Sequence, residues 1–241
     1  MPQPKAPHAA SFPPGNHILK SLTRDEYERL RPELRHVRLS PGQVLWEAGD
    51  HVRHAYFPTG GMVSLLSVTG EGSTVEVGIV GGEGLAGVSP VLCCETIPYR
   101  VVVQLPGTAL RLGVSPLRRE FARGGRLQEL LLGYTHSLLA QVSQSASCHR
   151  FHASERRLSR WLLVTRDRSE SDTLPLTQVF LAQMIGVPRT SVTAVALRLQ
   201  GRGLIRYSRG RITVLDRPGL EARSCECYRV ISESVRRYLA A

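Results

Sequence analysis

Two short apolar-patterned segments around a single glycine constrain the fold of this sequence more than any other feature. Thr177 is a suitable N-cap for a first helix, and Gly186 stands where a tight turn between two helices needs a residue that tolerates positive φ. Pro188 suits the first turn of a second helix. In that helix four apolar residues recur at i, i+3, i+4 and i+7 and define one buried face: Val192, Val195, Ala196 and Leu199. The pattern predicts a helix-turn-helix, with an ordinary corner between two helices as the alternative.

The segment that follows favours the helix-turn-helix. Residues 203–214 read as strand, tight turn and strand, and the turn contains Ser208-Arg209-Gly210-Arg211. Arginines at the tip of such a hairpin are suited to contact phosphate groups. Two helices around a glycine, followed by a basic hairpin, predict a winged helix.

The positive charge of the chain is concentrated in the same region. The 241 residues carry a net charge of +11, and residues 151–241 contain 16 Arg and 8 acidic residues, a net charge of +8. Such an excess is the electrostatic signature of a surface that binds a phosphate backbone. An arginine-rich composition without function is the alternative, because Lys5 and Lys20 are the only lysines.

The N-terminal part has a different texture, with short apolar runs separated by glycines. Apolar residues alternate with other residues over 75–79 and again over 99–105, which is typical of strands. We expect Pro106-Gly107 to turn the chain into a further strand. Short strands linked by glycine turns predict an antiparallel β-roll.

Glycines become rare after Pro116, and the apolar period becomes helical. A long apolar stripe on a helix of about 25 residues between two domains suits a partner helix. The alternative is a helix that packs on its own sheet. The residues expected in a dimer seam are Leu127, Leu131, Tyr134, Leu138 and Val142.

Three segments together resemble one known family. Residues 181–192 read Leu-Ala-x-x-Ile-Gly-Val-x-Arg-x-Ser-Val, residues 203–205 read Gly-Leu-Ile, and residues 81–84 form a Gly-Gly-Glu-Gly turn. Over roughly residues 18–241 the chain resembles the cyclic-AMP receptor protein and fumarate–nitrate regulator (Crp/Fnr) family. The resemblance implies an α+β fold with a β-roll of the cyclic-nucleotide-binding type, a long dimerisation helix and a C-terminal winged helix-turn-helix. The expected boundaries are a disordered lead-in at 1–17, the β-roll sensor domain at 18–122, the dimerisation helix at 123–150 and the DNA-binding domain at 151–241.

The same resemblance implies a homodimeric transcriptional regulator without enzymatic activity. It would bind double-stranded DNA at a two-fold-symmetric operator in the cytoplasm, with RNA polymerase as a further candidate partner. No membrane is implicated, since no stretch approaches the roughly 18 apolar residues of a membrane helix.

The residues expected to contact DNA lie in the winged helix. Arg189 can donate two hydrogen bonds to guanine O6 and N7. The best-known family members carry Glu and a second Arg where this chain has Thr190 and Ala194, so we expect Arg189 and DNA shape to carry more of the specificity. The expected contacts are Thr177, Gln178, Arg189, Thr190, Ser191, Thr193, Arg198, Arg209 and Arg211.

The effector of the β-roll, and hence any cofactor, is not defined by the sequence. In cyclic-nucleotide-binding members of the family a Gly-Glu turn precedes an Arg-Ser/Thr-Ala segment, whose arginine pairs with the cyclic phosphate. Here Glu83 is present, but the later segment reads Tyr99-Arg100-Val101, and an offset of one residue sends Arg100 to the other face of the strand. We expect a roll that does not respond to cyclic AMP, with Glu83, Tyr99 and Arg100 as candidate effector-pocket residues.

The five cysteines form no recognisable framework. An iron–sulfur sensor needs clustered N-terminal cysteines, and none precedes Cys93-Cys94. That pair and Cys225-x-Cys227 lack the spacing of a usual metal site and are expected to be structural. His149 and His152 follow Cys148 on one helix face near the hinge between domains. The favoured interpretation is solvated or DNA-facing histidines, with haem or metal ligation and a sensing role as the alternative.

Two further functions remain as alternatives. The first is an effector-binding module whose winged helix contacts proteins, which a weak dependence of DNA affinity on salt would support. The second is a thiol peroxidase built on Cys93-Cys94. It is disfavoured because no His or Arg is placed in the sequence to activate those thiols.

Overall fold

The computed structural model describes residues 15–169 and 171–240. Residues 1–14, which make up most of the expected lead-in, lie outside this range. Where the description begins, Asn16 is buried and its side chain caps helix α1 (His17–Lys20). The Asn16 amide also donates to the carbonyl oxygens of Pro58 and Gly84, at 3.1 and 2.9 Å. The chain is therefore anchored to the β-roll from Asn16 onward.

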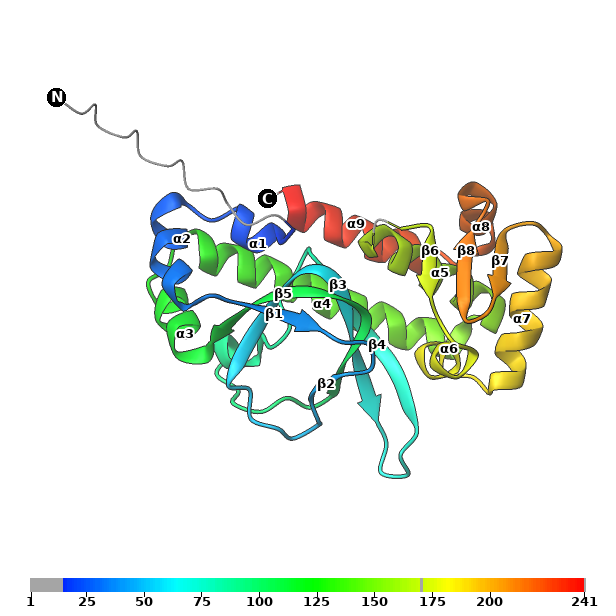
Figure 1. The fold of residues 1–241 in the computed structure, drawn as a ribbon, viewed down its shortest axis with the longest axis horizontal. Coiled ribbons are helices and arrows are strands. Elements are labelled where there is room, and N and C mark those ends of the chain that lie inside the picture. The colour runs from blue at the N-terminus through cyan, green and yellow to red at the C-terminus, as the bar shows by residue number, and fades with distance from the viewer. Residues whose placement is uncertain (1–14, 170, 241) are drawn as a thin grey trace.

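An antiparallel five-stranded sheet forms the N-terminal domain (Figure 1). Its strand order is β1-β5-β3-β4, and β2 pairs with β5. This is the predicted β-roll, and the alternations over 75–79 and 99–105 fall in β4 and β5. The elements are α2 (Arg24–Leu30), η1 (Arg31–Glu33), β1 (Arg35–Leu39), β2 (Val44–Trp46), β3 (His54–Val68), β4 (Thr74–Val80), η2 (Ser89–Leu92), β5 (Arg100–Gly113) and α3 (Val114–Ala122).

The turn expected at Pro106-Gly107 does not occur. Strand β5 continues through both residues to Gly113 and pairs with β3 along most of its length. A Cβ on Gly107 would collide with the carbonyl group of Gly60 on β3. The glycine at 107 therefore permits close approach of two backbones within a curved sheet, and the prediction of a turn was wrong.

A winged helix forms the C-terminal domain. Its three-stranded sheet has the order β6-β8-β7. Helix α5 leads into this domain, and four apolar residues on it are buried: Leu158, Trp161, Leu162 and Val164. The elements are α5 (Ser154–Ser169), β6 (Thr173–Pro175), α6 (Gln178–Ile185), α7 (Arg189–Gly201), β7 (Ile205–Ser208), β8 (Arg211–Val214), α8 (Arg217–Arg223) and α9 (Cys227–Ala240).

The long helix α4 (Arg126–Phe151) joins the two domains and lies close to the predicted range 123–150. Leu127, Leu131 and Tyr134 were expected in a dimer seam, but they are buried in the core of the β-roll of their own chain. This expectation is wrong for these three residues, because side chains covered by their own sheet have no surface left for a partner. Leu138 and Val142 are half-buried, and Leu138 also packs on the roll.

The apolar side chains of α4 that face outward belong to a neighbouring stripe. Leu132 and Leu139 are 51% and 66% exposed, and they lie seven residues apart on one helix face. The opposite side of α4 is occupied by the roll, and α9 runs back along it towards the N-terminal helices (Figure 1). The pattern of threes and fours in the sequence therefore located the helix, but its stripe follows mainly the face that packs on the roll.

One apolar core connects the sheet to the winged helix. It unites five residues of the roll, Met62, Leu66, Ile79, Val102 and Leu105, with Trp161 and the buried residues of α6 and α7. The two domains are thus packed together through apolar contacts as well as joined by α4.

No single helix among the described residues is both long and apolar enough to cross a membrane. The pair α6 and α7 reaches that length and composition only when taken together, and it is bent by 101°.

Candidate nucleic-acid interface

The helix-turn-helix is set by two local features at its turns. Thr177 caps α6, since its hydroxyl accepts a hydrogen bond from the backbone N–H of Phe180 at 3.2 Å. Gly186 ends α6 with φ of 60°, the left-handed conformation predicted for it. The axes of α6 and α7 meet at 101°, within the range of helix-turn-helix motifs.

Helix α7 divides into a buried and an exposed face as the sequence predicts. Val192, Val195, Ala196 and Leu199 are all buried. Arg189, Thr190, Ala194 and Leu197 are exposed, and Arg189 is the first residue of the helix. The N-terminal end of α7 therefore exposes a guanidinium and a hydroxyl group, as a helix that enters a DNA groove does.

The wing is a tight hairpin with two residues at its tip. Ser208 pairs with Arg211 across the turn, and Arg209 and Gly210 have φ values of 49° and 71°. Positive φ at both central residues is the geometry of a type I′ turn. The N–H of Leu176 donates to the Gly210 carbonyl at 2.8 Å, which ties the wing tip to the segment that leads into α6.

The wing and the helix-turn-helix share one hollow. It is lined by residues of three segments: Thr177, Gln178, Val179, Arg189, Tyr207, Ser208, Arg209 and Gly210. On its floor the Nε of Arg189 donates to Oε1 of Gln178 at 3.3 Å. Four predicted DNA contacts (Thr177, Gln178, Arg189 and Arg209) are therefore brought together on one surface.

Other expected contacts are placed differently. Arg198 is held in an ion pair with Glu155 of α5 at 3.2 Å, and Arg202 binds the same carboxylate. The hydroxyl of Thr193 donates to the carbonyl of Arg189 within α7, at 3.2 Å, and Ser191 is half-buried. Arg198 would have to leave Glu155 to reach a phosphate.

Sequence reasoning missed one arginine of the wing. Arg206 on β7 joins Arg209 and Arg211 around a second hollow, which Thr173 and Thr213 complete. The pairing of Arg206 with Thr213 places it on the wing sheet two residues from the turn. The available signal was the period of two: Arg206 and Ser208 share one face of β7, and Ser208 pairs with Arg211 on β8.

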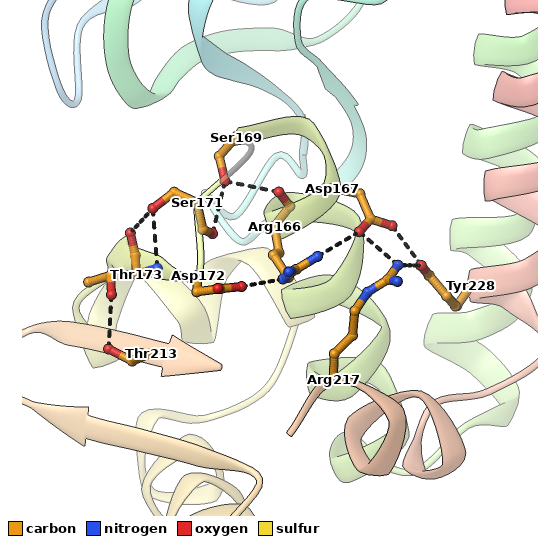
Figure 2. A network of polar contacts seen from close by, with 9 residues as sticks. All are labelled: Arg166, Asp167, Ser169, Ser171, Asp172, Thr173, Thr213, Arg217 and Tyr228. Carbon is orange, nitrogen blue, oxygen red and sulfur yellow. Dashed lines mark hydrogen bonds and ion pairs between the residues drawn. The ribbon is translucent and has the colours of Figure 1, made fainter. Parts of the chain in front are cut away.

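A polar network links the helices and strands of this domain (Figure 2). Arg217 donates to Asp167 at 3.0 Å and to the hydroxyl of Tyr228 at 2.8 Å, and that hydroxyl donates to Asp167 at 2.6 Å. Arg166 binds Asp172 at 2.5 Å. Helices α5, α8 and α9 are thereby fixed to one another, and Thr173 on β6 meets Thr213 on β8 at 3.1 Å.

The three candidate effector residues do not form a single pocket. Glu83 lines a pocket between the roll, α5 and α9, where Arg168 of α5 binds its carboxylate at 2.6 Å. Tyr99 and Arg100 do not line that pocket. Arg100 instead pairs with Glu47 at 2.6 Å on the outside of the roll, the other strand face that the sequence predicts for it.

Two family models match this chain. A model of the Crp-like helix-turn-helix domain matches residues 156–223, and a model of the cyclic nucleotide-binding domain matches residues 36–123. The chain belongs to the Crp/Fnr family of transcriptional regulators. Among curated proteins, no relative matches it significantly.

Solved structures of Crp/Fnr regulators share the fold. FixK2 from Bradyrhizobium japonicum aligns with a TM-score of 0.70 and 11% identity, over 80% of this chain and 98% of that one. The c-di-GMP-responsive global regulator CLP of Xanthomonas campestris gives 0.66 and 17%, over 80% and 99%. A CRP-family transcriptional regulator from Thermus thermophilus gives 0.64 and 18%, over 78% and 96%. The order of roll, long helix and winged helix in this Crp/Fnr chain is therefore that of the family.

Proposed function

We propose that this Crp/Fnr regulator is a homodimer that binds a two-fold-symmetric operator in a sequence-specific manner. The observation that carries this proposal is the hollow shared by Arg189, Gln178 and Arg209. Arg189 at the head of α7 reads guanine in the major groove, and Arg209 at the wing tip contacts phosphate. Two such surfaces related by a two-fold axis engage half-sites about 10 bp apart.

The outward stripe of α4 forms the dimer interface in this proposal. Leu132 and Leu139 are exposed on a helix of 26 residues whose other sides are covered by the roll and α9. A second copy of α4 packed along this stripe would bury both leucines. Apolar residues spaced by seven on a helix typically pack against a partner helix in this way. The dimer would act in the cytoplasm, with RNA polymerase as its partner at a promoter and without enzymatic activity.

The proposal excludes cyclic AMP as the effector. Glu83, the glutamate at the family's nucleotide-binding turn, is 11% exposed and already paired with Arg168. Arg100 faces away from it and pairs with Glu47, and the arginines that line the Glu83 pocket come from helices: Arg168, Arg217 and Arg236. A cyclic nucleotide bound at Glu83 would therefore have to break the buried Glu83–Arg168 ion pair, which is costly.

Selection from a random duplex library, followed by fluorescence anisotropy with the selected operator, tests the proposal. We expect a sequence with two-fold symmetry and an affinity that falls steeply with salt, because several arginines displace counterions from phosphates. The alternative, a winged helix that contacts proteins, predicts no selected sequence and no duplex binding at low salt. That result from a folded, full-length sample would overturn the proposal.

A further inference from the structure

Four metal-ligating side chains converge at the hinge between the domains. Cys148 and His152 lie at i and i+4 at the end of α4, and Cys225 and Cys227 lie at the start of α9. Their Sγ and ring nitrogen atoms all lie within 4.8 Å of one another. The three sulfurs are buried and form a cluster apart from the two apolar cores.

We propose that Cys148, His152, Cys225 and Cys227 bind one zinc ion in a closed tetrahedral site. Three thiolates and one imidazole are a standard donor set of structural zinc. With Zn–S and Zn–N bonds of about 2.3 and 2.0 Å, a tetrahedron sets its sulfurs about 3.8 Å apart and sulfur and nitrogen about 3.5 Å apart. The sulfurs of Cys148 and Cys225 are 3.5 Å apart, and Nδ1 of His152 is 3.4 Å from the sulfur of Cys227.

The groups around the site are arranged to support a metal. Nε2 of His152 lies 3.1 Å from the Glu226 carboxylate, and Nδ1 is the ring nitrogen that faces the Cys227 sulfur. A carboxylate behind the imidazole is the usual second partner of a zinc-bound histidine. The side-chain amide of Gln144 donates to the sulfur of Cys227 at 3.1 Å, as donors around zinc thiolates do.

The charge balance fits as well. Zinc with three thiolates and a neutral imidazole carries one net negative charge, and binding releases the three thiol protons to solvent. The buried guanidinium of Arg160 lies close enough to act on the Cys148 sulfur, and its Nε has no hydrogen-bond partner among the described residues. This cation offsets the charge of the filled site.

A disulfide accounts for less of this arrangement. A Cys148–Cys225 bond would use two of the four groups and would leave Cys227 and Nδ1 of His152 facing it without a role. His149, which the sequence offered beside His152, is not part of the cluster. Zinc would instead join the C-terminal end of α4 to the N-terminal end of α9.

Metal analysis of the full-length protein, purified under reducing conditions without chelator, tests the proposal directly. We expect one zinc per chain and, after exchange for cobalt(II), the absorption bands of a tetrahedral thiolate site. X-ray absorption should show about three sulfurs at 2.3 Å and one nitrogen at 2.0 Å. A metal-free protein that takes up no cobalt, or a Cys148–Cys225 disulfide in the reduced preparation, would overturn the proposal.

Variants that should keep the zinc, as well as variants that should lose it, test which side chains are its ligands. His152→Ala should lose most of the zinc, whereas His152→Cys should retain it, because four cysteines also form a closed zinc site. Glu226→Gln should weaken zinc affinity about 10- to 100-fold in a competition titration. The matched control replaces the exposed cysteines, Cys93→Ser with Cys94→Ser, and should keep the full zinc content. Zinc loss in this control, or equal content in the two His152 variants, would contradict the assignment.

Discussion

The indole N–H of Trp161 donates a hydrogen bond to Oε1 of Glu76 over 2.7 Å. Trp161 belongs to α5 of the winged helix and Glu76 to β4 of the roll, and both are buried. This is a polar contact inside the apolar core that the two domains share. Further hydrogen bonds extend this contact through the roll and back to α5. The Ser64 hydroxyl lies 2.6 Å from the Glu76 carboxylate and 2.7 Å from the Gln104 side chain, and Gln104 donates to Thr165 of α5 at 3.3 Å.

Replacing Trp161 with Phe should weaken the contact between the domains. The substitution keeps an aromatic ring but leaves the buried Oε1 of Glu76 without its donor, at a cost of about 1–3 kcal/mol in the free energy of unfolding. Chemical denaturation measures this cost. Trp46→Phe is the matched control, because Trp46 is equally part of a buried core but packs edge-on against Tyr56 within the roll. Equal destabilisation by both substitutions would show that the hydrogen bond contributes nothing.

Glu76 should make the stability depend on pH near neutrality. Burial raises the pKa of this carboxyl from 4.5 to about 7, against the opposing effects of its hydrogen bonds from Ser64 and Trp161 and the charges of Arg160 and Arg168. The hydrogen-bond geometry agrees. With Gln104 oriented as in the structure, the single Ser64 hydroxyl proton faces two acceptors, and a protonated Glu76 resolves the conflict by donating to Ser64.

The sign of the effect follows from proton binding. Between 4.5 and about 7 the folded chain holds a proton that the unfolded chain has released. The contribution of Glu76 to stability therefore falls as the pH rises through that window, by about 3 kcal/mol in total. Glu76→Gln, which keeps the hydrogen bonds of the neutral carboxyl, should flatten this part of the profile of unfolding free energy against pH. An unchanged slope in Glu76→Gln would assign the pH dependence to another group.

Arg189→Ala should reduce discrimination between the selected operator and random duplex by about 1–3 kcal/mol, since a bidentate contact to guanine is lost. Competition anisotropy measures the ratio of affinities. Arg229→Ala removes the same charge from an exposed position on α9, where the side chain is 75% exposed, and should leave the ratio unchanged. If the Arg189→Ala protein still discriminates between the operator and random duplex, other residues must recognise the bases.

Leu139→Glu should shift the protein from dimer to monomer in sedimentation velocity, because it places a charge at the centre of the outward stripe of α4. The control is Leu92→Glu. Leu92 is also an exposed leucine, 42% against 66% for Leu139, but it belongs to the 3-10 helix η2 (Ser89–Leu92) of the roll and not to the stripe of α4. A dimer that survives Leu139→Glu unchanged would place the interface elsewhere.

Cyclic AMP should not raise the melting temperature of the protein. A ligand that binds only the folded state stabilises it by about 2.7 kcal/mol at 100 times its dissociation constant. Because the Glu83 carboxylate is already paired with Arg168, we expect a saturating concentration of the nucleotide to leave the melting temperature unchanged in differential scanning fluorimetry. A shift that is abolished by Glu83→Gln would show that the nucleotide displaces Arg168.

The sequence predicts the winged helix well because its determinants are local. A cap at Thr177, a positive φ at Gly186 and a four-residue apolar stripe each act within one or two helical turns. The wing tip is equally local, since two residues with positive φ define the hairpin.

What the sequence did not predict depends on contacts between distant segments. From the sequence alone Gly107 looks like a turn glycine, because its close contact with the backbone of Gly60 is made only in the folded sheet. Leu131 and Leu139 belong to the same helical pattern, and only the position of the sheet separates the buried residue from the exposed one. The Glu83–Arg168 pair and the meeting of Cys148 with Cys225 join residues 85 and 77 positions apart. No short-range pattern encodes such a pairing.

The apolar core shared by the two domains limits how this protein could be recombined. If a different winged-helix domain were fused to the roll, five apolar side chains would be exposed to water unless the new domain offered a complementary apolar surface. These are Met62, Leu66, Ile79, Val102 and Leu105. Changes at these five positions of the roll are therefore coupled to the winged helix that packs on them. In the proposed function, a substitution at any of the five should alter DNA affinity from a distance.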